Sequence, residues 1–246
     1  HEEQKGRVVH TPRGTAVNLD LRHLGEHKIN ERLPFIRELA RAFVGVDPVH
    51  EPIPVRPAVH YTMGGIQTDI HTATSLTGLF AVGECASVGL HGANRLGSNS
   101  LAELSVFGKV AGEQAAALAA SVDQPSRQRC LDMARANEAR WQALREQRGS
   151  EKMADLRSRM MTTMEAGVGI YRSEDRLLAT CTELAELKER YRHLDLRDGS
   201  RVFNTEWLYA IELGFLLDVA EVMAHSALQR KESRGSHQRL DAFNRR

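Results

Sequence analysis

Residues 91–101 read His-Gly-Ala-Asn-Arg-Leu-Gly-Ser-Asn-Ser-Leu and place one arginine, Arg95, in a glycine-containing stretch that leads into a helix. Glycine lets a backbone approach a ligand closely and adopt a positive φ. Ser98, Asn99 and Ser100 are of the types that cap the unsatisfied amides of a helix start, where the helix dipole favours negative charge. An arginine fork beside such a start is suited to holding a carboxylate in a fixed plane. The stretch therefore predicts an anion-binding site.

Strand-like sequence precedes this stretch, and a long helix is expected to follow it. Residues 59–63 are rich in β-formers, and residues 78–83 are a short apolar run bounded by glycines, so both are predicted to be buried strands. Residues 101–120 carry apolar side chains at helical spacing and end in an alanine-rich run, which predicts a helix packed beneath the strands.

The regions before and after this central part have different predicted secondary structure. A helix is expected over residues 28–43, and the four prolines that follow it, up to residue 57, are typical of an extended connection. Beyond residue 123 the pattern is almost wholly helical. We expect Pro125 in a first turn and Ser173 and Asn204 at N-caps. The expected helices cover residues 125–148, 151–165, 174–192 and 205–231.

A methionine-rich stripe runs along one of these expected helices. Its members share helical spacing, and they are Met153, Leu156, Met160, Met161 and Met164. Because methionine fills irregular gaps in a core, the stripe favours packing over a contact with a cofactor.

The bulk properties exclude several classes of protein. The chain has 246 residues and a formal net charge of +1, so it can bury a sizeable core and carries no charge excess that favours a polyanionic partner. Its three cysteines form no Cys-x-x-Cys pair, so neither a disulfide framework nor a metal site is expected, and a reducing compartment fits best. No apolar run suits a bilayer span, so direct membrane insertion is not expected. Because the sequence opens in polar residues without Met, we expect it to be part of a longer polypeptide.

Two side chains outside the central stretch are candidates for a ligand site. His60 lies at the end of a predicted strand, where a lone histidine ordinarily has a structural role. Together with Arg95, however, it could clamp a small dicarboxylate, because ligands of open α/β sheets bind at strand ends. Glu84 follows the second predicted strand and is either an exposed turn carboxylate or an acceptor for ribose or ribityl hydroxyl groups.

Other polar residues carry weaker signals. The basic residues 230–239 could suggest nucleic acid, but they lack interleaved aromatics, so a solvated or domain-docking helix end is favoured and no nucleic-acid partner is expected. His71 and His91 are expected to be structural or exposed. Cys85 has no activating base beside it in the sequence.

Four stretches together resemble the flavoprotein subunits of fumarate reductase and succinate dehydrogenase, a family that also includes L-aspartate oxidase. They are residues 60–66 (His-Tyr-Thr-Met-Gly-Gly-Ile), 78–85 (Gly-Leu-Phe-Ala-Val-Gly-Glu-Cys), 89–101 and 230–239. Residues 89–101 are the longest and most specific of these, and they look most similar to bacterial fumarate reductase.

The resemblance implies an α+β architecture and a set of roles. It implies that residues 1–57 are a remnant of the capping domain and its linker. Residues 58–122 would be the returning segment of an FAD-binding α/β domain, and residues 123–246 a helical-bundle domain. By the family pattern, His60 and Arg95 bind the two carboxylates of fumarate or succinate. Glu84 and the backbone of Ser100 and Leu101 would contact FAD.

The resemblance also implies partners and leaves gaps. The implied partners are an iron–sulfur subunit and membrane anchor subunits, with the protein peripheral on the cytoplasmic face of the bacterial inner membrane. The family's Gly-x-Gly-x-x-Gly loop is missing from this sequence, and its proton-donating arginine would precede His1. No catalytic acid is therefore assigned here, and the chain is not expected to turn over alone. An L-aspartate oxidase and a non-enzymatic helical interaction module stay open as alternatives.

Overall fold

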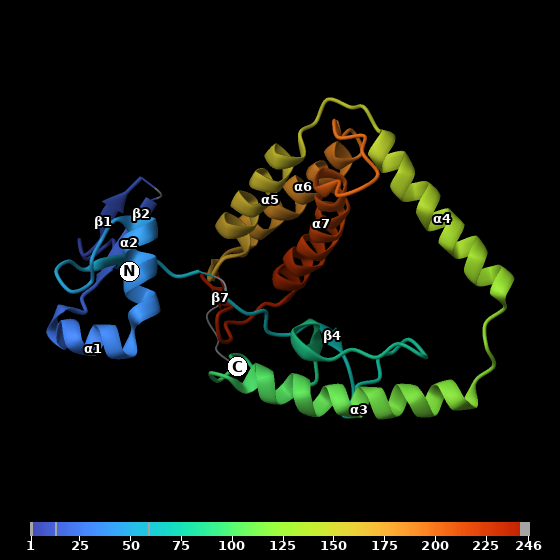
Figure 1. Ribbon diagram of the computed structural model, residues 1–246, viewed down its shortest axis with the longest axis horizontal. Helices are drawn as coiled ribbons and strands as arrows, with labels where there is room; N and C mark the ends of the chain where they lie inside the picture. Colours follow the sequence, from blue (N-terminus) through green and yellow to red (C-terminus); the bar gives the residue numbers. More distant parts are fainter. Residues whose placement is uncertain (1, 13, 59, 242–246) are drawn as a thin grey trace. The chain divides into compact units, whose positions relative to one another are not determined.

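The computed structural model describes residues 2–12, 14–58 and 60–241 and divides the chain into two compact units, residues 1–62 and 63–246 (Figure 1). Each unit has helices and short strands, which confirms the expected mixture of α and β structure.

The first unit is a small three-stranded antiparallel sheet with two helices. Its strands β1 (Val9–Thr11), β2 (Gly14–Leu19) and β3 (Ile53–Val55) pair in the order β1-β2-β3. A 3-10 turn, η1 (Arg22–Leu24), leads into α1 (Gly25–Arg32) and α2 (Pro34–Val44). The fully buried Ile29 anchors α1 in the small core.

One expected helix of this unit is two helices in the structure. The predicted helix over residues 28–43 is interrupted at Leu33, between α1 and α2. Pro34 explains the break, because a proline has no backbone N–H to donate and is tolerated only in the first turn of a helix. It occupies that first turn of α2.

The second unit begins with irregular chain around two very short parallel strands, β4 (Ile66–Gln67) and β5 (Ala86–Ser87). The 3-10 turn η2 (Gly83–Cys85) precedes β5, and the long helix α3 (Asn99–Ser121) follows it. The strand expected over residues 59–63 is wrong for residues 60–63, which have no regular structure; Val59 lies outside the described residues. The strand expected over residues 78–83 is also wrong, since only Phe80 forms an isolated bridge.

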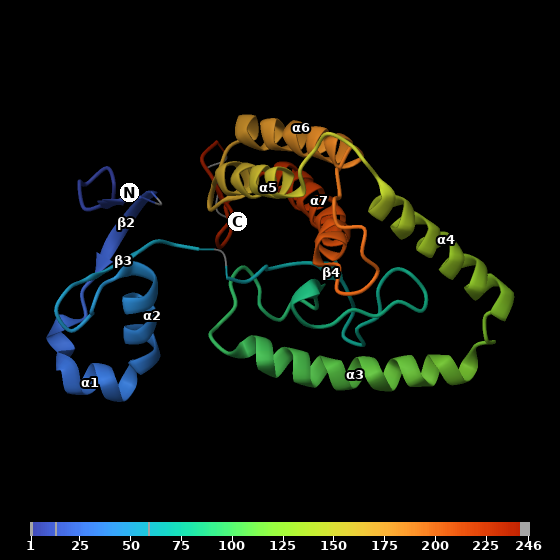
Figure 2. The ribbon, with the colours of Figure 1, turned by 45° about the horizontal axis from the view of Figure 1, so that its top comes forward.

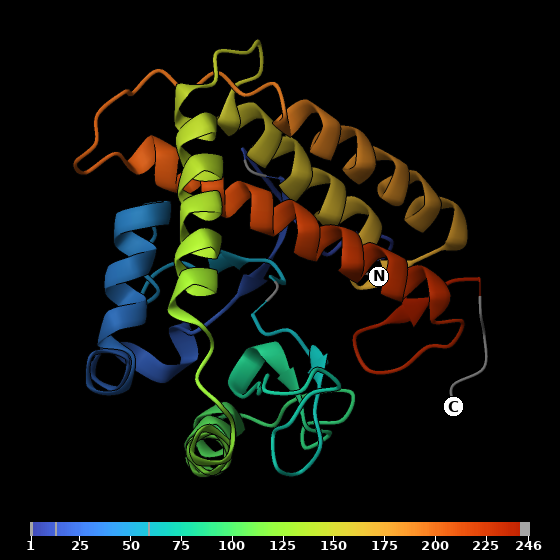
Figure 3. The ribbon, with the colours of Figure 1, turned by 90° about the vertical axis from the view of Figure 1, so that its right-hand side faces the viewer.

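The rest of this unit is helical, as expected. Helices α5, α6 and α7 pack on one another and lie side by side in Figures 1 and 2, and Figure 3 shows the same three as neighbours. Their shared core includes the fully buried Leu156, Leu177, Leu184 and Leu196. The helix and strand bounds are α4 (Arg127–Glu146), α5 (Met153–Val168), β6 (Tyr171–Arg172), α6 (Glu174–Tyr191), α7 (Thr205–Gln229) and β7 (Gln238–Arg239).

The N-cap residues of the structure agree only in part with those expected from the sequence. At Asn204 the side-chain oxygen accepts a hydrogen bond from the Trp207 amide at 2.7 Å, which confirms this cap. Ser173 precedes α6 but makes no side-chain cap bond. Pro125 lies before α4 rather than in its first turn, because Ser126 is the N-cap residue there.

The methionine-rich stripe of α5 faces the core, as predicted. Leu156 and Met160 are buried, and Met153 and Met164 pack against the same cluster. Met161 is the exception and points outward, with 59% of its surface exposed.

Candidate functional site

The loop that carries Arg95 joins β5 to α3 and has an unusual backbone. Left-handed conformations occur at Gly89 (φ +81°), Gly92 (φ +59°) and Ser98 (φ +65°). Glycine adopts such angles without strain, whereas serine does so at a cost. Arg95 lies half-buried between these positions, and its Nη1 donates to the Leu96 carbonyl oxygen at 3.2 Å. The arginine is thus presented on a tightly turned loop rather than on a helix or a strand.

The start of α3 immediately follows this loop. The expected side-chain cap at Ser98 is wrong, because no side-chain cap bond forms there. Its left-handed backbone accounts for this, since a capping residue ordinarily has an extended conformation. Instead the Leu101 amide donates to the Ser98 carbonyl oxygen at 3.1 Å. Ser100 is half-buried and Leu101 is exposed. The positive end of a 23-residue helix therefore lies next to the Arg95 loop, an arrangement that favours an anion.

Glu84 lies close to the same helix. It sits in η2, which packs against α3, and a Cβ built on the adjacent Gly83 would lie 3.8 Å from the Leu104 Cβ. The Glu84 side chain is exposed. The chain therefore folds back between η2 and α3, so that η2 and the first turns of α3 pack together at the two ends of the segment that carries Arg95.

A close approach of two backbones fixes η2 in place. Gly65 has φ +126°, and a Cβ there would lie 2.4 Å from the Cys85 carbonyl oxygen. Any other residue would push the two segments apart. Gly65 therefore serves backbone packing beside Glu84.

His60 lies in the first unit, whereas Arg95 lies in the second. It is exposed and belongs to an irregular segment, so the structural role usual for a lone core histidine does not apply to it. Its pairing with Arg95 across a dicarboxylate stays a prediction.

A buried carboxylate of α3 forms a hydrogen bond with the loop that carries Arg95. Glu103, in the second turn of α3, is only 2% exposed, and its Oε2 lies 2.9 Å from Nε2 of His91. His91 is itself largely buried, which agrees with the structural role expected of it. No role is predicted for Glu103 from the sequence, although a carboxylate between apolar neighbours in a predicted helix is a usable signal.

The basic segment of residues 230–239 packs against the same loop, at Ala93. A Cβ on Gly235 would lie 2.2 Å from the Ala93 carbonyl oxygen, and Gly235 has φ +59°. No sequence signal marks this contact, because its partners lie far apart in the chain.

One arginine of this segment, Arg239, is buried and paired internally. Arg239 is 5% exposed and donates to Asp241 and to the Arg230 carbonyl oxygen at the end of α7. The hydrogen bonds from the Arg239 guanidinium hold the pKa of the Asp241 carboxyl well below its usual range. Arg239 therefore holds the end of α7, and its charge is not displayed on the surface.

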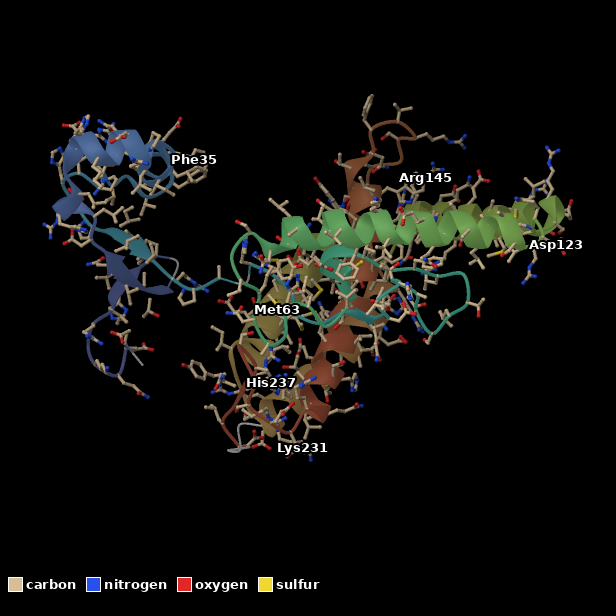
Figure 4. All side chains as sticks on the ribbon, turned by 90° about the horizontal axis from the view of Figure 1, so that it is seen from below. Phe35, Met63, Asp123, Arg145, Lys231 and His237 are labelled. Carbon is tan, nitrogen blue, oxygen red and sulfur yellow. The ribbon has the colours of Figure 1, made fainter. Side chains whose placement is uncertain are left out.

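His237 makes a second internal contact of this segment, with an arginine of β6. His237 Nδ1 lies 2.6 Å from an Nη atom of Arg172 on β6. Burial, with the nearby positive charges of Arg172 and Arg239, lowers the pKa of His237. Figure 4 shows His237 and Lys231 in the chain that follows α7. The histidine therefore stays neutral and accepts the arginine's hydrogen bond.

Within residues 2–12, 14–58 and 60–241, no cluster of three or more side chains is arranged to hold a metal ion. In the same residues no helix is long and apolar enough to cross a membrane. Cys85, Cys130 and Cys181 are free thiols.

Comparison with known proteins adds family matches at both ends of the chain. Residues 157–246 match the family described as fumarate reductase flavoprotein C-term. Residues 1–101 match the family described as FAD binding domain.

Individual relatives match over almost the whole chain. The chain is 60% identical over 242 residues to the fumarate reductase flavoprotein subunit of Proteus vulgaris, which covers 98% of this chain and 40% of that protein. It is 40% identical to the succinate dehydrogenase flavoprotein subunit of Rickettsia bellii, over 92% of this chain and 39% of that protein. A solved Escherichia coli quinol fumarate reductase superposes with a TM-score of 0.94 at 58% identity, covering 100% of this chain and 42% of that one. The chain thus spans about 40% of the length of the curated relatives it matches.

Proposed function

The chain belongs to the family of fumarate reductase and succinate dehydrogenase flavoprotein subunits, and from that premise we propose that it forms part of a full-length flavoprotein that interconverts fumarate and succinate through FAD. One structural observation carries this proposal. Arg95 lies on a tightly turned loop directly before the positive end of α3, with η2 packed beside it. This arrangement suits a small dicarboxylate that is held next to the ring system of a flavin.

Arg95 and His60 are the proposed substrate ligands. The guanidinium of Arg95 offers two parallel N–H groups to one carboxylate, which binds it in a fixed plane. The same group stabilises negative charge that builds on the substrate during the reaction. His60 holds the second carboxylate, and its exposed side chain in an irregular segment leaves it accessible to a ligand.

The residues around η2 and α3 fit a flavin. Ser98 provides no side-chain cap for the first turn of α3, although the Leu101 amide donates to its carbonyl oxygen. The positive end of the helix at Ser100 and Leu101 is therefore suited to face an anionic ring edge. Glu84 is exposed beside that helix and is suited to accept hydroxyl hydrogen bonds. When bound, FAD supplies the hydride acceptor and donor that side chains lack. The residues of this chain bind and orient the two reactants.

The parts of the chain take the following proposed roles. Residues 1–57 are part of a capping domain and its linker, residues 58–122 part of the FAD-binding domain, and residues 123–246 a helical domain. One similar solved structure is a quinol-fumarate reductase with menaquinol molecules, which supports assembly into a larger complex. We propose an iron–sulfur subunit and membrane anchor subunits as partners, with the flavoprotein peripheral on the cytoplasmic face of the bacterial inner membrane.

The test compares two assays on the purified full-length flavoprotein. Fumarate is supplied with a reduced viologen in one, and L-aspartate with oxygen in the other. The proposal expects flavin-dependent oxidation of the viologen by fumarate and no oxidation of aspartate. Activity with aspartate alone would assign the chain to an L-aspartate oxidase. Absence of bound flavin and of both activities would favour an interaction module.

A further inference from the structure

The loop that carries Arg95 needs anchors outside its own backbone. Residues 89–98 form neither helix nor strand, and their left-handed positions give no regular hydrogen-bond ladder. A loop of this kind keeps one conformation only when neighbouring groups hold it. The question is which side chains fix the direction of the Arg95 guanidinium.

The contact between His91 and Glu103 is such an anchor. His91 is four positions before Arg95 in the same loop, and Glu103 is four positions after the first residue of α3. Their 2.9 Å hydrogen bond therefore ties the loop to the helix whose start is proposed to contact FAD. Rotation of the loop about that helix start would break this bond.

The burial of Glu103 is costly, and apolar residues beside it on α3 are more exposed than this carboxylate. Glu103 is 2% exposed, whereas the neighbouring Leu101 and Leu104 are 66% and 44% exposed. Its Oε1 is buried with no hydrogen-bond partner among the described residues. Removing a carboxylate from water costs free energy, and an apolar residue would fill the space more cheaply. The polar contact to His91 is what this position provides.

We infer that Glu103 and His91 are positioning residues for the reaction. Through their hydrogen bond they hold Arg95 at a fixed place relative to the start of α3, and so hold the substrate carboxylate relative to the flavin. This inference rests on the proposed function. Neither residue touches the substrate in this scheme, and both act through Arg95. A displacement of about 1 Å at a reacting centre is enough to cost about a hundredfold in rate.

The experiment uses the full-length flavoprotein and three variants, Glu103→Ala, Glu103→Gln and His91→Ala. For each variant we would measure the bound FAD, the melting temperature, the KM for fumarate and the inhibition constant of succinate. The kcat for fumarate is expressed per bound flavin. Glu113→Ala is the matched control, because Glu113 is exposed on the same helix and pairs only loosely with Lys109 at 3.8 Å.

For Glu103→Ala and His91→Ala we expect kcat/KM to fall by about tenfold to a hundredfold, with KM and the succinate inhibition constant rising together. Glu103→Gln should stay within about threefold of the parent, because its amide can still hydrogen-bond to His91. A purely structural pair would instead lower the FAD content or the melting temperature and leave the values per flavin unchanged.

The outcomes separate this inference from the proposed function. If the parent reduces fumarate and both alanine variants match it per bound flavin, the inference is wrong and the function stands. If neither alanine variant folds while Glu103→Gln behaves as the parent in every measurement, the pair serves stability and the inference is again wrong. A parent with no fumarate activity overturns the proposed function, and the inference falls with it.

Discussion

Single side chains carry the chemistry proposed for this chain, and Arg95 carries the largest part. Its half-buried position and its hydrogen bond to the Leu96 carbonyl oxygen restrict the guanidinium to few orientations. A planar fork in a fixed orientation binds a carboxylate through two bonds, which a lysine ammonium cannot reproduce.

Replacing Arg95 by lysine in the full-length flavoprotein should therefore lower kcat/KM for fumarate by more than about a hundredfold. The charge is kept, so the loss comes from the second hydrogen bond and the fixed plane. Arg127→Lys, at an exposed position of α4, is the control and should leave the rate unchanged. Near-normal turnover by the Arg95 variant would contradict the assignment.

His237 is a residue whose protonation state matters for stability. In the folded chain its pKa is lowered, chiefly by burial and also by the charges of Arg172 and Arg239. In the unfolded chain it has the ordinary value of about 6.5. The folded state thus binds fewer protons than the unfolded state, so the contribution of neutral His237 is present above about pH 6.5 and is lost as the pH falls below it.

The prediction is that His237→Asn loses less stability than the parent between about pH 8 and about pH 5.5, because its side chain does not titrate. Melting temperatures across that range measure the difference. His225→Asn is the control, since His225 is exposed on α7, and it should follow the parent curve. Parallel curves for the parent and the His237 variant would refute the role given to this histidine.

At the scale of elements, the caps decide how firmly helices begin. Asn204 caps α7 through the Trp207 amide, and its Nδ2 also donates to the carbonyl oxygens of Asp198 and Ser200. Ser173 stands in the same position before α6 and makes no such side-chain bond. Two residues of equally good capping type thus differ in what they contribute.

Asn204→Ala should lower the free energy of unfolding by about 1–2 kcal/mol, because three hydrogen bonds are lost at a nearly buried site. Ser173→Ala should change it by less than about 0.5 kcal/mol. Urea titration followed by far-UV circular dichroism compares the two variants. Equal losses in both would show that residue type alone, rather than the bond formed, determines the effect.

For the whole molecule, the two compact units have separate cores. The fully buried Ile29 belongs to the first, and the fully buried Leu184 to the cluster formed by α5, α6 and α7. Both tryptophans, Trp141 and Trp207, pack against that second cluster. Tryptophan fluorescence therefore reports on the second unit.

Leu184→Ala should destabilise the fluorescence-detected transition by about 2–5 kcal/mol, because it leaves a cavity in a closely packed core. Ile29→Ala creates a comparable cavity in the other unit and should leave that transition in place. Urea unfolding followed by tryptophan emission makes the comparison. A matching shift in both variants would mean that the units unfold together.

The sequence alone determined most of the helices, and it also determined that a glycine-containing loop with Arg95 precedes a long helix. The long helices follow from apolar spacing and cap residues, which act over a few neighbouring positions, so their bounds differ from the prediction by only a few residues. The predicted helix over residues 28–43 failed for a local reason that Pro34 already carried.

Only the tertiary structure decided the strands and the supports of the site. Residues 60–63 and 78–83 have strand-like composition, but a strand exists only where another segment supplies its hydrogen bonds, and that pairing is not local. The contacts of Glu103 with His91, and of Gly235 with Ala93, likewise join positions that the chain must first bring together. Local patterns fix which side chains are available for chemistry, whereas long-range packing fixes which of them meet.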